Sequence, residues 1–535
     1  RKQKVWLKAG TSQSVFCTLL RPTRTMASLT KPLDDIVKPK TKEILIDGRV
    51  YDVTKYRHPG GSIINFMLDA DATDVFREMH YRSKKAHKVL KALPSRELGS
   101  KDTDTKQFFT YGEVPAVKDD DVSTAAPDSS ENEDELAAIK VEERKNNAER
   151  AEKNKARNEK LIKEFRELEE QFKKEGIFDP CIPHVIWRMT ELVLLHVIGV
   201  YLCYAYGWIY MGLAVVGIGQ GRCGWFMHEG GHGSLTGNIK IDRRIQEFFY
   251  GFGDGMSGAW WRNQHNKHHA TPQKIEHDVD LNTLPLVCFH HQIANESKIG
   301  KALLKNKFYR EYWLKYQNLA FGPVTCLLVA LGWQLYLHPH HSFRTKNYIE
   351  LFWMALRYVS WFMLLPYALT TGHGGAVPGV LSMMGYYLWY VEVGSSMIFI
   401  NFAMSHTHLD VVQKDEHVNW VQYSSRYTVN VQNCYLVNWW MAYLNFQIEH
   451  HLFPQCPQFR FPRISHRVKE VLERNGETYK VFTYWEGLQV TFANLRDQAD
   501  EALQQARIEA TLRKKGMIDA DHDALLQKEH AKKSQ

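Results

Sequence analysis

Closely paired cysteines are missing from this sequence. Its eight cysteines are scattered along 535 residues, and no CxxC motif occurs. Several of them lie in apolar stretches, where a thiol behaves as a small hydrophobic side chain. This distribution argues against a disulfide framework and indicates a reduced chain that faces the cytosol.

The sequence also lacks a concentrated basic surface. Its formal net charge of +8 is a small excess for this length, and no compact Lys/Arg stripe with interleaved aromatic residues occurs. No nucleic-acid partner is therefore expected, whereas attraction to an anionic membrane surface is. A secretory signal is not recognisable either, and the first methionine is Met26. We expect residues 1–40 to be a leader or disordered segment outside the fold.

Composition divides the rest of the chain into four parts. Residues 41–100 alternate like strands and then carry short helical pieces, which predicts an α+β module. Residues 101–175 are expected to form an acidic and then a charged helical linker. Residues 176–485 are expected to form a membrane domain, and 486–535 a C-terminal helix and cytosolic tail. The end of the linker carries an apolar stripe that would lie on a membrane or domain surface, at Leu161, Phe165, Leu168 and Phe172.

Five apolar stretches mark the membrane domain, and each approaches the ~20 residues that a spanning helix needs. They are residues 184–206, 208–227, 318–337, 351–371 and 378–403. The first two are separated only by a turn near Gly207, which predicts a tight hairpin. Basic residues flank 318–337 on both sides, so both of its ends should stay in the cytosol, whereas the loop "TGHGGAVP" carries no Lys or Arg. We predict four spanning helices and one interfacial or re-entrant segment.

Histidines gather in three tight groups, at spacings that place side chains on one face of a helix. The groups are "HEGGH" with His228 and His232, "HNKHH" with His265, His268 and His269, and "QIEHH" with Gln447, His450 and His451. Imidazole suits iron, copper, nickel or zinc, and seven imidazoles are too many for one tetrahedral zinc. One HxxxH arises often by chance, but three groups that each follow an apolar segment are hard to explain that way. A two-metal site fits the count best.

A fourth contributor follows the last apolar stretch, in "NFAMSHTHLD". We expect His406 to join the site and His408 to be an outer or surface residue. Four carboxylates near the groups are candidates for hydrogen bonds with imidazole N–H groups, although ordinary surface positions explain each of them equally well. They are Glu229, Asp278, Asp280 and Glu449.

The order HxxxH, HxxHH and QxxHH around two helical hairpins resembles the membrane fatty-acid desaturases. The segments "WWRNQHNKHHATPQKIEHDVDLNTLPL" and "LNFQIEHHLFP" carry most of this resemblance. It implies an α-helical integral membrane domain with a cytosolic cap that holds two non-haem iron ions. The implied ligands are His228, His232, His265, His268, His269, His406, His450 and His451.

A second resemblance lies within residues 41–100. "HPGG" at 58–61 is followed by "DATDVFREMH", which ends at His80, and this pattern resembles cytochrome b5. It implies that His58 and His80 are the axial ligands of a haem b, while His87 falls outside the pattern. A haem with two histidine ligands has no open position for oxygen, so electron transfer is its expected task. The linker would give the module the reach to meet both a reductase and the membrane site.

A cytochrome b5 module fused to a desaturase whose third group begins with Gln resembles the front-end desaturases. This resemblance implies an O2-dependent enzyme that introduces a cis double bond between an existing one and the carboxyl end of a polyunsaturated acyl chain. Electrons would come from NADH through cytochrome b5 reductase, and the substrate would be a membrane lipid or an acyl-CoA. The alternatives are a sphingolipid long-chain-base desaturase, an acyl-lipid hydroxylase of the same type, and a haem protein whose histidine groups have lost their metal.

Gln447 distinguishes the third group from the other two. An amide oxygen is a weaker ligand than imidazole, so Gln447 would bind one iron weakly or through water and leave that side open to oxygen or substrate. Glu392, within the last apolar stretch, is either a functional acid or a protonated packing contact. The cytochrome b5 partnership and a dilysine at Lys532 and Lys533 predict a multi-pass protein of the endoplasmic reticulum, with both termini and the active site cytosolic.

Overall fold

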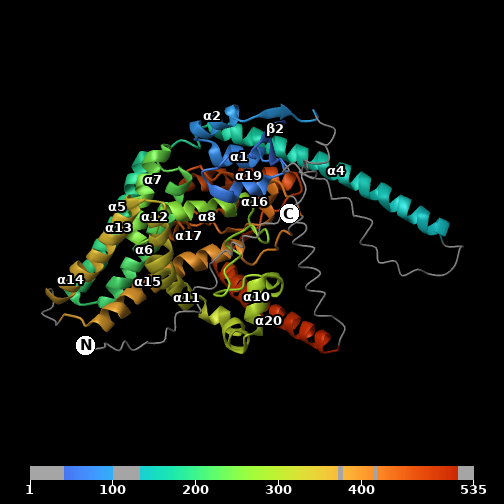
Figure 1. Cartoon of the computed structure of the whole chain (residues 1–535). Coiled ribbons are helices and arrows are strands. Elements are labelled where there is room, and N and C mark those ends of the chain that lie inside the picture. The colour runs from blue at the N-terminus through green and yellow to red at the C-terminus, as the bar shows by residue number, and fades with distance from the viewer. Residues whose placement is uncertain (1–40, 101–132, 372–376, 414–415, 417, 516–535) are drawn as a thin grey trace, which may run out of the picture. The chain divides into compact units, whose positions relative to one another are not determined.

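The computed structural model (Figure 1) describes residues 41–100, 133–371, 377–413, 416 and 418–515. The expected leader, the acidic part of the linker, most of the "TGHGGAVP" loop and the dilysine tail lie outside these residues. The described chain from Lys42 onward belongs to one compact unit.

The α+β module begins with a hairpin of β1 (Glu43–Ile46) and β2 (Arg49–Asp52). Asp47 and Gly48 form its two-residue turn with φ angles of 51° and 72°, which suit an Asp-Gly turn. β3 (Ser95–Glu97) pairs antiparallel with β2, so the strand order is β1-β2-β3. Three helices complete the module: η1 (Gly61–Met67), α1 (Thr73–His80) and α2 (Lys84–Ala92).

The linker ends in one long helix, α4 (Glu133–Lys174). Its predicted apolar stripe packs in one core with Phe453, just after the third histidine group, and with α19 (Phe461–Arg474). The four stripe residues are each at most 7% exposed: Leu161, Phe165, Leu168 and Phe172. The sequence predicts that the stripe lies on a membrane or on a domain surface, and the structure places it on a domain surface.

Two helices form the predicted hairpin, α5 (Ile182–Tyr206) and α6 (Ile209–His232). Gly207 ends α5 with a φ of 65°, a conformation that glycine adopts without strain. Gly199 and Gly212 face each other so closely that a Cβ on either would clash with the backbone of the other. Glycine at these positions therefore permits the close packing of the two helices.

Among the described residues, three helical segments are long and apolar enough to cross a membrane: Ile182–Tyr206, Tyr309–Arg344 and Tyr348–Thr370. The second combines η4 (Tyr309–Trp313), η5 (Leu314–Tyr316), α11 (Gln317–Leu327), η6 (Leu328–Leu337) and α12 (His338–Arg344). The third combines α13 (Tyr348–Val359), η7 (Ser360–Leu364) and α14 (Leu365–Thr371). α15 (Val380–His406) packs along the hairpin helix α6. Each of these two helices has a histidine as its last residue. In Figure 1 these helices form the bundle that carries the labels α5, α6, α13, α14 and α15.

The remaining elements form a cap at the ends of this bundle. Between the hairpin and the second apolar segment lie α7 (Ile239–Phe248), η3 (Phe249–Gly253), α8 (Gly258–Ala270), α9 (His291–Glu296) and α10 (Lys298–Lys305). After α15 come α16 (Trp420–Arg426), β4 (Asn430–Val431), α17 (Tyr435–Trp440), α18 (Gln447–Leu452), η8 (Gln458–Arg460), α19, β5 (Val481–Phe482) and α20 (Tyr484–Lys514). β4 pairs in parallel with β5.

Candidate metal centre and haem pocket

Eight histidines meet where four helices of the bundle and cap come together. They are His228 and His232 of α6, His265, His268 and His269 of α8, His406 of α15, and His450 and His451 of α18. Each is at most 9% exposed. The structure therefore brings together all eight residues that the sequence predicts as iron ligands.

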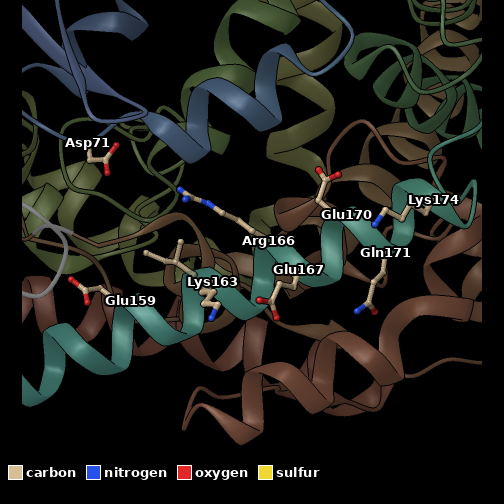
Figure 2. A pocket seen from close by; sticks show the side chains of 9 residues that line it. Asp71, Glu159, Lys163, Arg166, Glu167, Glu170, Gln171 and Lys174 are labelled. Atoms are coloured by element: carbon tan, nitrogen blue, oxygen red, sulfur yellow. The ribbon is translucent and has the colours of Figure 1, made fainter. Parts of the chain in front are cut away.

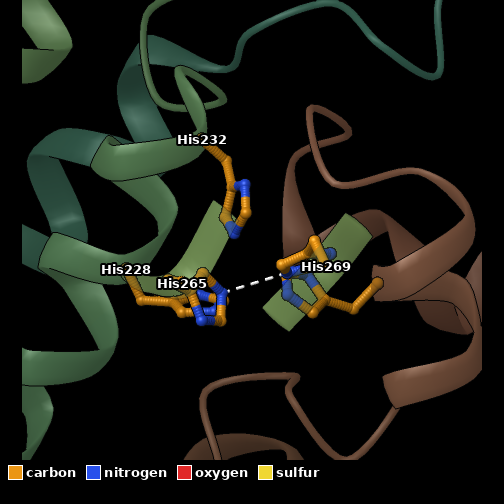
Figure 3. Close-up of side chains that lie close together, drawn as sticks. His228, His232, His265 and His269 are labelled. Atoms are coloured by element: carbon orange, nitrogen blue, oxygen red, sulfur yellow. Dashed lines mark hydrogen bonds between the residues drawn. The ribbon is translucent and has the colours of Figure 1, made fainter. Parts of the chain in front are cut away.

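Helical spacing directs the first imidazoles at one another. His228 and His232 are four residues apart on α6, as are His265 and His269 on α8, and this spacing places each pair on one face of its helix. Figure 3 shows these four side chains converging from their two helices. The Nε2 atoms of His265 and His269 are 3.0 Å apart, and the ring centroids of His228 and His265 are 4.6 Å apart.

The imidazole nitrogens fall into two groups, within each of which they lie no more than 4.8 Å from one another. The first group is His228, His232, His265, His269 and His450, and the second is His268, His406 and His451. Each adjacent pair, His268–His269 and His450–His451, gives one ring to each group, because neighbouring side chains on a helix point about 100° apart. The doubled histidines therefore place two metal positions side by side.

The donor atoms fit two metal ions. Among the described residues, several of these buried nitrogens have no hydrogen-bond partner, which is unfavourable unless a metal binds them. They are Nε2 of His232 and His268, Nδ1 of His269, and both ring nitrogens of His450 and His451. Burial lowers the pKa of His265, His269, His450 and His451 well below 6.5. These imidazoles are therefore neutral, which is the form that binds iron.

Two of the predicted carboxylates hold His268 from outside the cluster. Nδ1 of His268 lies 3.0 Å from Oδ2 of Asp278 and 3.3 Å from Oδ2 of Asp280. Burial lowers the pKa of His268, but the two carboxylates outweigh burial and raise the pKa to about 9. With Nδ1 engaged in this way, Nε2 of His268 is the nitrogen left for the second group, and a metal bound there would displace its proton.

The other two predicted carboxylates are buried but contact no imidazole of the cluster. Glu229 accepts a hydrogen bond of 3.2 Å from the backbone N–H of Gln458. Glu449 accepts hydrogen bonds from Asn430 (2.8 Å) and from the Tyr479 hydroxyl (2.6 Å). The side-chain amide of Gln458 instead lies 2.9 Å from Nδ1 of His228. Sequence reasoning misses Gln458, because it begins η8, a helix of three residues that is too short to show helical periodicity.

Gln447 and His408 differ in their relation to the two histidine groups. Gln447 begins α18 and is 5% exposed, and its side chain acts to raise the pKa of His406 against the stronger lowering by burial. It therefore lies beside the second group. His408 belongs to neither group, and its ring packs against Phe482 at 5.5 Å between centroids.

The predicted haem ligands face each other inside the α+β module. The ring centroids of His58 and His80 are 6.0 Å apart, which leaves room for one metal atom between them. Both rings line a cavity whose other walls are mainly apolar, including Ile64 and Leu90. Burial lowers the pKa of both imidazoles, that of His80 to about 4, so both rings are neutral. His87 lies outside this cavity, against Phe76.

These features define a helical, histidine-rich metalloprotein with a haem module. The sequence model of the fatty acid desaturase family matches residues 202–483, and that of the cytochrome b5-like heme/steroid binding domain matches residues 34–98. The chain belongs to the fatty acid desaturase family.

Three curated relatives show how far the similarity extends. An acyl-lipid (8-3)-desaturase of Rebecca salina is 45% identical over 460 residues, covering 86% of this chain and 92% of the relative. A protein of the same name from a Thraustochytrium species is 42% identical over 463 residues, covering 85% and 92%. The Delta(6)-fatty-acid desaturase fat-3 of Caenorhabditis elegans is 24% identical over 456 residues, covering 83% and 92%. The similarity therefore includes both the haem module and the membrane domain.

The family assignment confirms several predictions. The chain is an oxidoreductase of the desaturase class with a helical membrane-type domain and a fused cytochrome b5-like domain. The predicted cofactors, a haem and a pair of irons, are those that this domain and the histidine cluster indicate. The named relatives are acyl-lipid and fatty-acid desaturases, which favours the front-end prediction over the sphingoid-base alternative.

Proposed function

We propose that this chain is a front-end desaturase in which the eight clustered histidines hold two irons and in which His58 and His80 hold the haem. The division of the eight imidazoles into two adjacent groups with unpartnered nitrogens carries this proposal. When bound, the iron pair supplies, with O2 and two electrons per turnover, the oxidising power to remove two hydrogens from adjacent methylenes. No side-chain acid or base could break such C–H bonds.

The chain's own residues orient these ligands and keep water away. Asp278 and Asp280 fix the ring of His268, and the amide of Gln458 fixes that of His228. The burial of the cluster keeps bulk solvent from the reacting carbon atoms. α6 and α15 both end at the cluster, so an acyl chain among the membrane helices would reach the metals from the apolar side.

Lipid feeding tests the reaction. A yeast strain that expresses the chain is given single polyunsaturated acids, and its lipids are profiled. We expect a new cis double bond on the carboxyl side of the existing ones. Desaturated sphingoid bases or hydroxylated acyl chains in its place would overturn the proposal, and purified protein should contain two irons and one haem per chain.

We further propose that the substrate is a lipid-bound acyl chain whose first double bond is at carbon eight and that the new bond forms at carbon five. Support comes from the two relatives above 40% identity, which are both named acyl-lipid (8-3)-desaturases. The test uses the same feeding experiment with acids whose first double bond starts at carbon eight or carbon nine. A new bond at carbon six would overturn this regiochemistry without affecting the front-end assignment.

Gln447 is proposed to keep one side of the second metal position open. Its contact with His406 places the amide beside that position, and an amide oxygen binds iron more weakly than an imidazole. We expect Gln447→Ala to lose most activity and Gln447→His to retain some of it. Product yield per iron measures both variants, and an unaffected alanine variant would leave Gln447 with a packing role only.

For the membrane topology we propose four spanning helices, with the segment Tyr309–Arg344 lying along one membrane face. At one end of this segment the Trp313 indole donates to the carbonyl oxygen of Leu286 (3.0 Å), and at the other His338 accepts from the backbone N–H of Ser257 (2.8 Å). Leu286 follows α8 and Ser257 caps its start, so both ends of the segment meet the region that carries the second histidine group. Cysteine labelling from either side of sealed membranes tests this, because opposite accessibility of positions 307 and 346 would overturn it.

We also propose the boundaries 41–100, 101–175, 176–485 and 486–535 for the haem module, linker, desaturase domain and C-terminal helix and tail. The matched ranges 34–98 and 202–483 support the two domains. Because a cytochrome b5-like module needs a reductase, we propose the endoplasmic-reticulum membrane, with both termini and the active site cytosolic and cytochrome b5 reductase as partner. Fluorescence microscopy of the tagged chain, together with NADH-driven reduction of its haem by the purified reductase, tests this proposal.

A further inference from the structure

Helix α8 has two functional faces. Its inner face carries His265, His268 and His269, whereas its outer face touches the haem module. Asn266 is one of the residues that line the haem cavity, although it comes from the desaturase domain. Asn263, one turn earlier, lies with Oδ1 3.7 Å from the place where a Cβ on Gly61 would stand. One helix therefore contacts both cofactor sites.

A ring contact beside the second metal group strengthens this junction. Phe66 of η1 stacks on His277, with ring centroids 4.4 Å apart and planes 10° from parallel. His277 immediately precedes Asp278, whose carboxylate holds His268. The haem module thus rests on the same loop that positions a predicted iron ligand.

Gln455 makes the second junction, four residues after His451. Its side-chain N–H groups donate to the carbonyl oxygens of Glu78 (3.2 Å) and Met79 (3.1 Å), directly before His80. In return, Arg82 donates to it twice, from its backbone N–H to Oε1 and from its guanidinium to the backbone oxygen, both at 3.2 Å. Gln455 is 6% exposed, so these hydrogen bonds are shielded from water.

The end of the linker supports the module from a third side. Arg166 of α4 binds Asp74 of α1 at 2.9 Å, and Asp74 is 5% exposed. Figure 2 shows Arg166 extending from α4 toward the module, beside a charged groove that also includes Asp71. The apolar stripe of α4 is buried in the core around Phe453, so this part of the linker is packed against the desaturase domain and is not a flexible connection.

We propose that α8, the Gln455 turn and the end of α4 form a fixed dock for the haem module, with Gln455 as its positioning residue. The dock holds the haem cavity, which Asn266 helps to line, against the helix that carries three predicted iron ligands, so the two cofactor sites stay at one separation. The contacts alone support the dock. A fixed separation would let the haem pass electrons to the irons without a docking step, and this consequence also rests on the proposed haem and iron ligands.

Cross-linking tests the dock without reference to activity. The full-length holoenzyme receives Phe66→Cys and His277→Cys together with a protease site between residues 101 and 132, and is treated with a short bismaleimide before cleavage. We expect the haem module to stay covalently attached to the desaturase domain after denaturation. The single variants Phe66→Cys and His277→Cys report any reaction with native cysteines. Release of the module from the double variant, as from the single ones, would overturn the dock.

A rescue experiment separates positioning from a general structural role. In Gln455→Ala we expect the reduced haem to be reoxidised about tenfold more slowly, as for the loss of ~1.4 kcal/mol of docking free energy, with unchanged haem absorbance and iron content. The Phe66–His277 cross-link should restore the rate, whereas Gln413→Ala, at an exposed glutamine, should behave as the parent. A parental rate in Gln455→Ala, or a slow rate that the cross-link leaves unchanged, would refute the positioning role. A wrong assignment of the haem ligands can be told apart from a wrong dock. If His58 is not a haem ligand, the variant His58→Ala would retain its haem, while the Phe66–His277 cross-link would form as before.

Discussion

The two cofactor sites of this chain are built in opposite ways, although both use histidine. His58 and His80 come from one small module, are partly exposed, and face each other across an apolar cavity. The iron site gathers eight buried rings from four helices, and neighbouring rings contact one another directly, as His269 and His451 do at 4.2 Å. A haem is large and would be held mainly by the shape of the apolar cavity between its two ligands. A metal ion is small and would be held by the imidazole nitrogen atoms that point at it. The haem pocket thus depends on the shape of its walls, and the iron centre on the position of each buried nitrogen.

The largest effect should follow the loss of one imidazole from the cluster. His269→Ala removes a nitrogen from the first group and leaves its neighbours incompletely coordinated. We expect desaturation to fall below detection and iron to fall below two per chain, while haem absorbance stays normal. Elemental analysis and the haem spectrum measure these changes together. A full iron content in this variant would remove His269 from the ligand set.

The mirror-image experiment removes a haem ligand. His58→Ala should abolish turnover supported by NADH and leave two irons per chain, because the two sites share no side chain. Product formation with NADH and reductase is measured without added cytochrome b5. Undiminished NADH-driven turnover under these conditions would contradict the haem role of His58.

A smaller loss of iron or activity should follow when a carboxylate that contacts an imidazole is replaced, and none when a carboxylate without such a contact is replaced. Asp278→Asn weakens the contact with His268, and the loss of such a partner typically costs about 10–100-fold in metal affinity or activity. Glu449 is the matched control, because it contacts Asn430 and Tyr479, and burial raises its pKa to about 7. Glu449→Gln resembles its neutral form and should retain iron. Equal losses in the two variants would show that burial alone, and not the imidazole contact, matters.

The smallest effect concerns pH and stability after iron removal. Seven of the eight cluster imidazoles, all except His268, have folded-state pKa values below 6.5, so below pH 6.5 these seven groups hold more protons in the unfolded chain than in the folded chain. Their contribution to the stability of the iron-free chain is therefore complete above that pH and is lost as the pH falls, and it outweighs the opposite contribution of His268, whose pKa is raised. Between pH 7.5 and 5.5 we expect its Tm to drop by roughly 5 °C more than that of the iron-loaded chain. Thermal unfolding in detergent measures this difference, and parallel Tm profiles would count against neutral buried imidazoles.

Much of the iron site could be predicted from the sequence because helical spacing is a local property. The i, i+4 pairs His228–His232 and His265–His269 share a helix face wherever those helices pack. The haem pair follows instead from the resemblance of "HPGG" and "DATDVFREMH" to cytochrome b5, and the structure places the two rings 6.0 Å apart between centroids. His406 could be expected from its place after an apolar stretch, and the structure brings it to His268 and His451.

The sequence by itself therefore determined which histidines are proposed as metal ligands and which long apolar stretches form helices. Only the tertiary structure decided how the doubled histidines divide between two groups, and that Asp278 and Asp280 rather than Glu229 and Glu449 contact an imidazole. It also decided that Gln458, at the start of η8, contacts His228 and that Gln455, in the turn before it, contacts the haem module. Local spacing sets the direction of a side chain along its own helix. What that side chain meets depends on how distant helices pack, and here the packing follows burial of apolar stripes such as that of α4.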